Sequence, residues 1–226
     1  MTWFDTKNGQ RLLNLEDEVL SEFLEDKFGY FALQTNTNGR NLLKKTRMKH
    51  HIMLDGKEKN LSCLLDQLPL ESDSVDLTIC QHVIEKNKDN LGLLNELFRI
   101  TIPEGRVVIF SFNPFSFAGL RNLTFFDGKF PWNSKFISMG DTQKKLKECG
   151  FSIEQGKLIE YQLLFSDAYN YSKYFDDVGA RWLPLLGNIY FIVAKKEVPG
   201  ITPVSYTHLR AHETRGKLGC PLVGEK

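Results

Sequence analysis

The sequence LPLESDSVDLTIC, residues 68–80, joins a polar turn to a short apolar run. Residues 71–74 are typical of a turn, and residues 75–80 predict a buried strand. Leucines at helical spacing follow in residues 89–100, and residues 106–111, RVVIFS, predict a second buried strand because they are β-branched and apolar. Strands that alternate with helices in this way indicate an α/β fold whose sheet is mostly parallel and covered on both faces.

The same patterns predict elements on both sides of this stretch. We expect further strands at residues 30–33, 51–54, 61–65, 151–154 and 186–194. We expect helices at residues 11–28, which Gly29 would end, from about Arg40, and at residues 141–149, with Asp141 as the N-cap. Residues 113–138 are expected to form a long loop rich in aromatic side chains.

Composition narrows the class of protein. The 226 residues are 42% hydrophobic and 25% charged, as in a globular protein, and the net charge of +1 predicts no general attraction to nucleic acid or to an anionic membrane. No stretch approaches the ~20 apolar residues of a membrane span, and residues 1–5 lack the features of a signal peptide, so we expect a cytoplasmic protein. The four cysteines have no metal-site spacing, so we expect reduced thiols and no metal.

The end of the chain has a different character. Residues 204–214, VSYTHLRAHET, resemble the translation of a transposase adapter used to build sequencing libraries. We therefore expect one domain over residues 1–203 and a non-native tail over residues 204–226. The alternative is a native disordered tail.

Three motifs in the central stretch carry a family resemblance. Residues 68–77 resemble the pattern "LPF…SFD", residues 82–85 (HVIE) resemble "hvLEh", and residues 95–105 (NELFRITIPEG) resemble "lLrEi.RvLkPGG", with Glu104 in place of one glycine. In this order they resemble the class I S-adenosylmethionine (SAM) dependent methyltransferases. Residues 112–121 (FNPFSFAGLR) are similar to a run found in a little-characterised bacterial subgroup.

The resemblance implies a Rossmann-like, doubly wound, mostly parallel seven-stranded sheet with an antiparallel edge strand. Another doubly wound fold is the alternative. It also implies SAM as the cofactor, held over the carboxyl ends of the strands. The family's glycine loop corresponds to residues 34–39, where Gly39 is the surviving glycine and Gln34, Asn36 and Asn38 would join it in binding. Asparagine tolerates left-handed backbone, which would preserve the turn. A polar loop that binds nothing is the alternative.

The remaining donor contacts follow from the same resemblance. Asp55 stands where the family has the acid that binds both ribose hydroxyls, or else it is a turn residue before Gly56. Leu64 replaces the acid expected beside the adenine, so Leu64 and Leu65 would line an apolar slot, and Asp66 would substitute only if the loop shifts. Gln81 and His82 follow the strand at the family's catalytic edge.

The expected activity is methyl transfer to a small-molecule acceptor. His82 would accept a proton from that acceptor, or it would line the SAM pocket. An aromatic cluster would wall the acceptor pocket or pack as a lid: Phe112, Phe115, Phe117, Phe125, Phe126, Phe130 and Trp132. The basic run over residues 40–51 reads as a solvated helix face, which makes nucleic acid an unexpected partner. The alternative function is a catalytically inactive methyltransferase-like binding or regulatory module, because the glycine loop and the adenine acid are altered.

Overall fold

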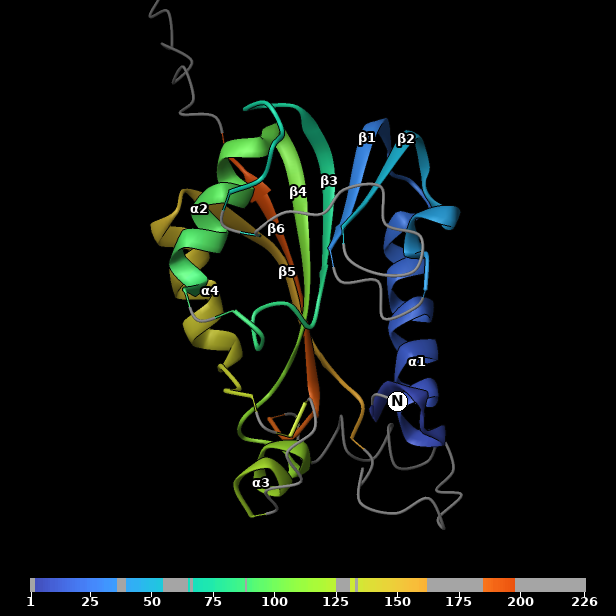
Figure 1. Ribbon diagram of the computed structural model, residues 1–226, viewed down its shortest axis with the longest axis vertical. Helices are drawn as coiled ribbons and strands as arrows, with labels where there is room; N and C mark the ends of the chain where they lie inside the picture. The colour runs from blue at the N-terminus through green and yellow to red at the C-terminus, as the bar shows by residue number, and fades with distance from the viewer. Residues whose placement is uncertain are drawn as a thin grey trace, which may run out of the picture.

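A six-stranded sheet runs through the part of the chain that the structure describes (Figure 1). This computed structural model describes residues 3–35, 40–54, 65, 67–87, 89–124, 131–132, 134–161 and 185–197. The strands are β1 (Phe28–Thr35), β2 (Arg47–Leu54), β3 (Val75–Gln81), β4 (Thr101–Phe112), β5 (Phe151–Ile159) and β6 (Ile189–Lys196). Their order is β2-β1-β3-β4-β6-β5, with the first four parallel and β6 antiparallel to both neighbours.

The expected α/β class and mostly parallel sheet are thereby confirmed. The strand expected at residues 61–65 lies outside the described residues except for Leu65, so the described sheet has six strands instead of seven.

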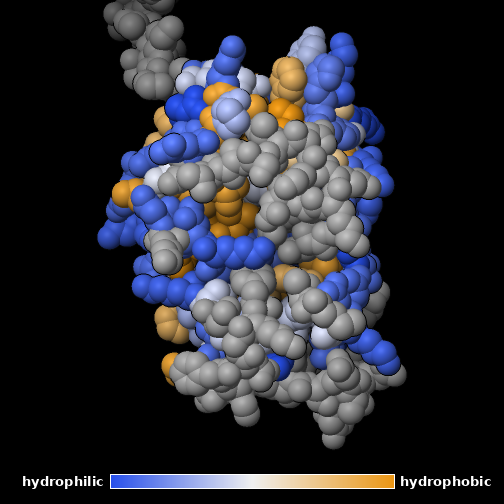
Figure 2. All heavy atoms as spheres, in the orientation of Figure 1, coloured by the Kyte–Doolittle hydropathy of each residue, from blue (hydrophilic) through white to orange (hydrophobic). Residues whose placement is uncertain are grey.

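Helices cover both faces of the sheet. Helix α1 (Lys7–Leu24) and the 3-10 helix η1 (Trp3–Asp5) lie on one face, and α2 (Asn90–Ile100) and α4 (Met139–Glu148) lie on the other (Figure 1). Alternate residues of β4 supply two separate apolar clusters, since Phe110 packs toward α1 while Ile109 packs toward α2. Hydrophilic side chains gather over the outer surface of the helices, and apolar ones show between them (Figure 2).

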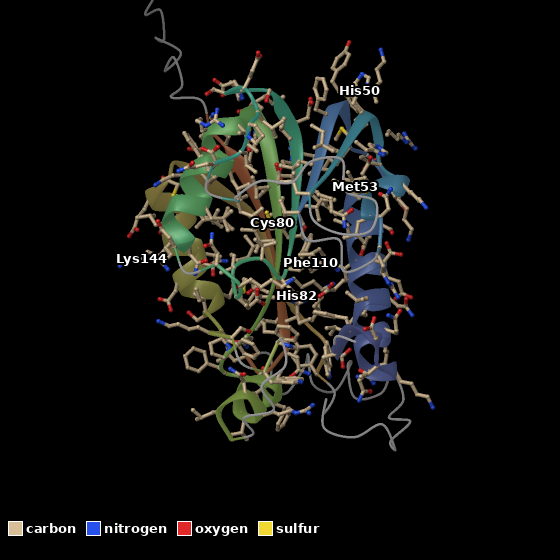
Figure 3. The ribbon with its side chains drawn as sticks, viewed as in Figure 1. His50, Met53, Cys80, His82, Phe110 and Lys144 are labelled. Carbon is tan, nitrogen blue, oxygen red and sulfur yellow. The ribbon has the colours of Figure 1, made fainter. Side chains whose placement is uncertain are left out.

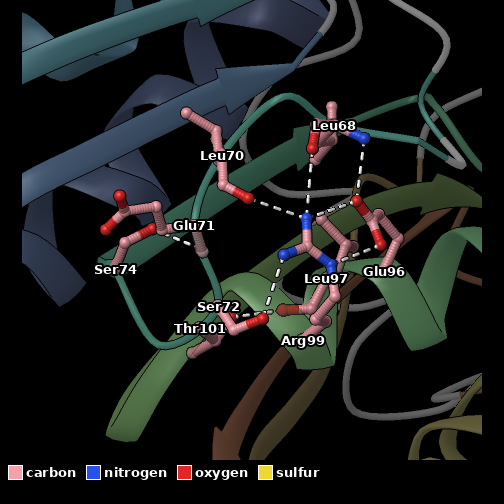
Figure 4. Close-up of polar contacts among 9 residues, drawn as sticks. All are labelled: Leu68, Leu70, Glu71, Ser72, Ser74, Glu96, Leu97, Arg99 and Thr101. Carbon is pink, nitrogen blue, oxygen red and sulfur yellow. Dashed lines mark hydrogen bonds and ion pairs between the residues drawn. The ribbon is translucent and has the colours of Figure 1, made fainter.

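The stretch at residues 68–74 is held in place by Arg99 at the end of α2 (Figure 4). The Arg99 guanidinium donates to the backbone carbonyls of Leu68 and Leu70 at 3.1 and 2.8 Å and to both oxygens of Glu96. Glu96 in turn accepts from the Leu68 backbone N–H at 2.8 Å. This planar, five-donor group fixes the turn that leads into β3.

The segment at residues 103–105 forms an irregularity inside β4. The register jumps from Thr101 opposite Val75 to Arg106 opposite Leu77. Glu104, which replaces a family glycine, adopts the left-handed φ of 66° that a glycine would take easily. At Gly105 a Cβ would lie 2.7 Å from the Thr101 side chain, so glycine is required there.

Several expected boundaries were wrong. Helix α1 begins at Lys7 after the Thr6 cap and ends at Leu24, while Gly29 belongs to β1. A Cβ on Gly29 would lie 2.7 Å from the Asp76 carboxylate, so this glycine serves strand packing and does not end the helix. The cap of α4 is Ser138, whose hydroxyl accepts from the Asp141 backbone N–H at 3.1 Å. The expected aromatic loop contains helix α3 (Phe117–Thr124).

The basic run also has a different structure from the expected helix face. Leu42–Lys45 form the short 3-10 helix η2, Arg40 precedes it, and the basic residues from Arg47 onward lie on β2. Arg40 donates to Asn14 and Gln10 of α1, and Lys45 pairs with Asp17 at 2.8 Å. The side chains of Arg40 and Lys45 thus hold this segment against α1.

Candidate functional site

The carboxyl ends of β1, β2 and β3 meet at one edge of the sheet. Thr35 at the end of β1 is paired with Leu54 of β2 and with Cys80 of β3. Parallel sheets bind ligands at this edge, next to the point where the strand order reverses. Strand β1 is followed in the chain by its neighbour β2 on one side, and β3 continues on the other, so the reversal lies between β1 and β3.

Four of the expected site residues are described, and the structure brings three of them to this edge. Gln34 lies near the end of β1, Gln81 ends β3, and His82 follows it. Leu65 is half-buried against the apolar cluster on the α2 face. The other expected residues lie outside the described ones: Asn36, Asn38, Gly39, Asp55, Leu64 and Asp66.

Gln34 joins the two sides of the loop that follows β1. Its side chain is fully buried, donates to the Arg40 carbonyl at 2.9 Å and accepts from the Leu42 backbone N–H at 2.9 Å. Both polar ends of the carboxamide are therefore occupied by backbone beyond the loop. Gln34 fixes where residue 40 returns to the sheet.

Gln81 and His82 converge on one carboxylate, that of Glu16 on α1. Gln81 Nε2 donates to Glu16 Oε2 at 2.5 Å, and His82 Nε2 lies 2.8 Å from Glu16 Oε1. Successive strand residues point to opposite faces, so an extended backbone would separate these two side chains. His82 instead has a φ of 52°, a left-handed conformation that is rare for residues other than glycine and is concentrated at functional sites.

The second nitrogen of His82 faces another carboxylate. His82 Nδ1 lies 3.3 Å from Glu85 Oε1, which also accepts from the Phe112 backbone N–H at 2.6 Å. The imidazole stacks between Phe4 and Phe112, with ring centroids 5.1 and 4.6 Å away. Figure 3 shows His82 beside Phe110 in the middle of the molecule, well inside its surface.

Two opposing effects act on the charge of His82. Burial disfavours the charged ring, but the carboxylates of Glu16 and Glu85 favour it more, and the pKa of His82 rises from 6.5 to about 9. His82 is consequently protonated at neutral pH, with both nitrogens donating to carboxylates. This geometry favours the alternative in which His82 shapes the pocket, and its exchange of a proton with an acceptor stays a prediction.

Glu16 and Glu85 are functional candidates that the sequence reasoning missed. Glu16 lies on the buried stripe of α1 between Leu12 and Leu20, with spacings of four residues. An acid at such a position is the sequence signal from which a buried partner could have been predicted. Glu85 carried no comparable signal, because its contacts depend on the turn at His82.

The members of the expected aromatic cluster differ in how far they are buried. Phe112 and Trp132 are buried in the cluster on the α1 face, while Phe115 is 70% exposed. Phe125, Phe126 and Phe130 lie outside the described residues. The described members thus support lid packing more than a continuous pocket wall.

The comparisons with known proteins agree with this geometry. Residues 33–109 match the model of a methyltransferase-domain family. The match is confined to these residues, which are similar to a methyltransferase domain. The uncharacterized protein YafS of Escherichia coli K12 is 23% identical over 207 residues, which cover 88% of this chain and 82% of that protein.

Solved methyltransferases share the fold. A SAM-dependent methyltransferase from Thermotoga maritima has a TM-score of 0.61 and 18% identity, covering 83% of this chain and 90% of that one. One from Archaeoglobus fulgidus has a TM-score of 0.60 and 17% identity, covering 83% and 94%. Among the described residues, no helix is long and apolar enough to cross a membrane, and no three potential metal ligands are grouped.

Proposed function

We propose that this chain binds SAM at the carboxyl edge of β1, β2 and β3 and transfers its methyl group to a small-molecule acceptor. The observation that carries the proposal is the coincidence of the family match with this edge. The matched residues 33–109 contain Gln34, Gln81 and His82, which the fold brings to the strand ends. The resemblance of the sequence motifs supports the same placement.

The described residues fit a cofactor by forming the floor of its site. Gln34, Gln81 and His82 are fully buried, and each has its polar groups engaged within the protein. The contacts to SAM would come from the residues that the family resemblance assigns to it: Asn36, Asn38 and Gly39 for the methionine part, Asp55 for the ribose, and Leu64, Leu65 and Asp66 around the adenine. Gln34 would support the first of these groups, because it fixes the far end of their loop.

The charge of the buried cluster suits the cofactor. Glu16 and Glu85 place two carboxyl groups against the single imidazole of His82, and this excess of acidic groups favours a positive sulfonium nearby. When bound, SAM would supply an activated methyl group, whose carbon would form a bond to an acceptor lone pair as its bond to sulfur breaks and the neutral thioether leaves. His82 then acts as a positioning residue that joins α1 to the end of β3. Alignment and the exclusion of water would supply most of the rate.

Isothermal titration with SAM and with S-adenosylhomocysteine tests the proposal. We expect both to bind, and Gln34→Ala to weaken binding about tenfold, because it frees the loop and leaves the Leu42 N–H without its partner. Gln155→Ala is the matched control, since Gln155 is exposed on β5 away from this edge. Asp55→Ala should also weaken binding if the ribose contact is correct.

The inactive binding module makes the opposite prediction. It expects no heat and no thermal shift with either ligand at millimolar concentration. That outcome would remove the methyltransferase activity proposed here. Binding that Gln34→Ala leaves unchanged would retain the activity but place the donor site elsewhere.

A further inference from the structure

A hollow of about 650 Å³ opens on the α2 face, beyond the carboxyl end of β3. One side consists of residues 85–87 and 89–91, which run from the end of β3 into the first turn of α2, and the other consists of Ser134, Lys135, Ile137 and, within α4, Lys145. None of the donor-site residues expected from the sequence lines it.

Two residues that line this hollow each have a buried oxygen without a hydrogen-bond partner. Glu85 Oε2 is one of them, although Oε1 of the same carboxylate is held by Phe112 and His82. Asn90 Oδ1, in the first turn of α2, is the other. The residues are 5% and 9% exposed. A buried acceptor without a partner destabilises the folded protein, so a ligand that brings hydrogen-bond donors to these oxygens would offset that cost.

Positive charge surrounds the same hollow. Lys86, Lys135 and Lys145 line it, against the two carboxylates of Glu85 and Asp89. One oxygen of Asp89 is occupied as the helix cap, accepting from the Gly92 N–H at 3.0 Å. Among the described residues, no acidic side chain pairs with the exposed Lys135 or with the half-buried Lys145. An anionic group would find two ammonium groups available there.

Glu85 connects the hollow to the proposed donor edge. Its Oε1 contacts His82, which directly follows Gln81 at the end of β3, while Oε2 has no hydrogen-bond partner and the residue itself lines the hollow. A ligand group that donates to Glu85 Oε2 would therefore be separated from the His82 ring by the Glu85 carboxylate.

We propose that this hollow is the acceptor pocket, and that the acceptor is a small molecule in which an amine donor is joined by a short chain to an anionic group. The amine donates to Glu85 Oε2 and Asn90 Oδ1, and the anion, a carboxylate or a phosphate, lies against Lys135 and Lys145. The assignment as acceptor pocket rests on the proposed function, whereas the binding chemistry of the hollow does not.

Binding is measured without SAM, so that it is independent of methyl transfer. The probes are ω-amino acids from glycine to 6-aminohexanoate, each followed by nuclear magnetic resonance titration of the protein. We expect at least one length to bind about tenfold more tightly than both propylamine and propionate, which carry one group each. If every length binds no better than these single-group compounds, the inference is overturned. A matched set of ω-amino phosphates distinguishes the carboxylate from the phosphate source.

Variants then locate the binding. Lys145→Ala and Asn90→Ala should each weaken the best probe about fivefold or more, while Asn90→Asp, which keeps the acceptor oxygens, should retain binding. Lys147→Ala is the matched control, because Lys147 is exposed on the same helix and does not line the hollow. Equal effects of Lys145→Ala and Lys147→Ala would show general electrostatics and refute the site. Urea unfolding of each variant shows whether it is folded.

Labelled SAM separates the two proposals. Transfer of the labelled methyl group to the bound probe supports both. Probe binding in a protein that binds no SAM would keep the ligand site and reject its role as acceptor pocket together with the proposed function. SAM binding with no response to any probe would reject the inference and leave the proposed function standing.

Discussion

Raising the pH should weaken the folded protein through one side chain, His82. Its pKa is raised from 6.5 to about 9 in the folded state, so between these values the folded protein holds one proton more than the unfolded chain. The stabilising effect is complete below pH 6.5 and disappears as the pH rises through about 9. At about 1.4 kcal/mol for each pH unit, the difference of about 2.5 units (9 − 6.5) amounts to about 3 kcal/mol.

Urea unfolding at a series of pH values measures this free energy. The wild-type protein is compared with His82→Gln, and the difference between their free energies of unfolding should shrink by about 3 kcal/mol from pH 6.5 to pH 9. Burial also raises the pKa values of Cys80 and Tyr190, which lowers stability at high pH, but both proteins share these groups. His50→Gln, at an exposed position on β2, is the control and should leave the pH dependence unchanged.

Parallel curves for the wild type and His82→Gln would refute the reasoning. If His82→Gln does not fold, the ring proton resonances of His82 in the wild type provide the second measurement. They should titrate near pH 9, and a midpoint near 6.5 would show that the two glutamates do not hold the ring in its charged form.

Two further predictions concern other parts of the fold. Arg99→Lys should lower the free energy of unfolding by about 1–2 kcal/mol and speed hydrogen exchange at the Leu68 amide. The reason is that lysine cannot reproduce the forked contacts of the guanidinium. The control Arg47→Lys, at an exposed position on β2, should change neither quantity. Burial raises the pKa of the Cys80 thiol to about 12, so iodoacetamide should modify Cys80 only after unfolding, and modification of the folded protein, found by peptide mass spectrometry, would contradict its burial.

The sheet could be predicted from the sequence because its signals are local. The β-branched runs that became β3 and β4 are each preceded by turn residues, and the leucines of α2 repeat at helical spacing. The boundaries that were wrong depend on contacts between distant residues. Gly29 is a helix stop by local reasoning, yet the Asp76 side chain from β3 occupies the space that a Cβ would need. Local patterns carry no information about such a neighbour.

The candidate site was predictable only in part for the same reason. The family motifs and the strand ends placed Gln81 and His82 at the end of β3, where the structure has them, whereas their part in a donor site stays a prediction. Their partner Glu16 lies 66 residues before His82, and the contact requires the left-handed backbone at His82 that turns the ring toward α1. Sequence spacing predicts that side chains alternate between the two faces of the sheet along a strand. The contacts of this site depend on His82, which lies just beyond β3, where that alternation ends.

The turn at His82 also explains how one carboxylate serves both faces of the sheet. His82 contacts Glu16 of α1 through Nε2, whereas Glu85, three residues later, contacts Nδ1 through Oε1, has no hydrogen-bond partner at Oε2 and lines the hollow. The pH dependence of stability and the binding of an amine should therefore share Glu85 but differ in their other residues. Glu85→Gln should alter both, Glu16→Gln should reduce the pH dependence without removing a lining group of the hollow, and Asn90→Ala should weaken the amine alone. That pattern distinguishes a shared carboxylate from a general loss of structure, in which every substitution would affect both measurements together.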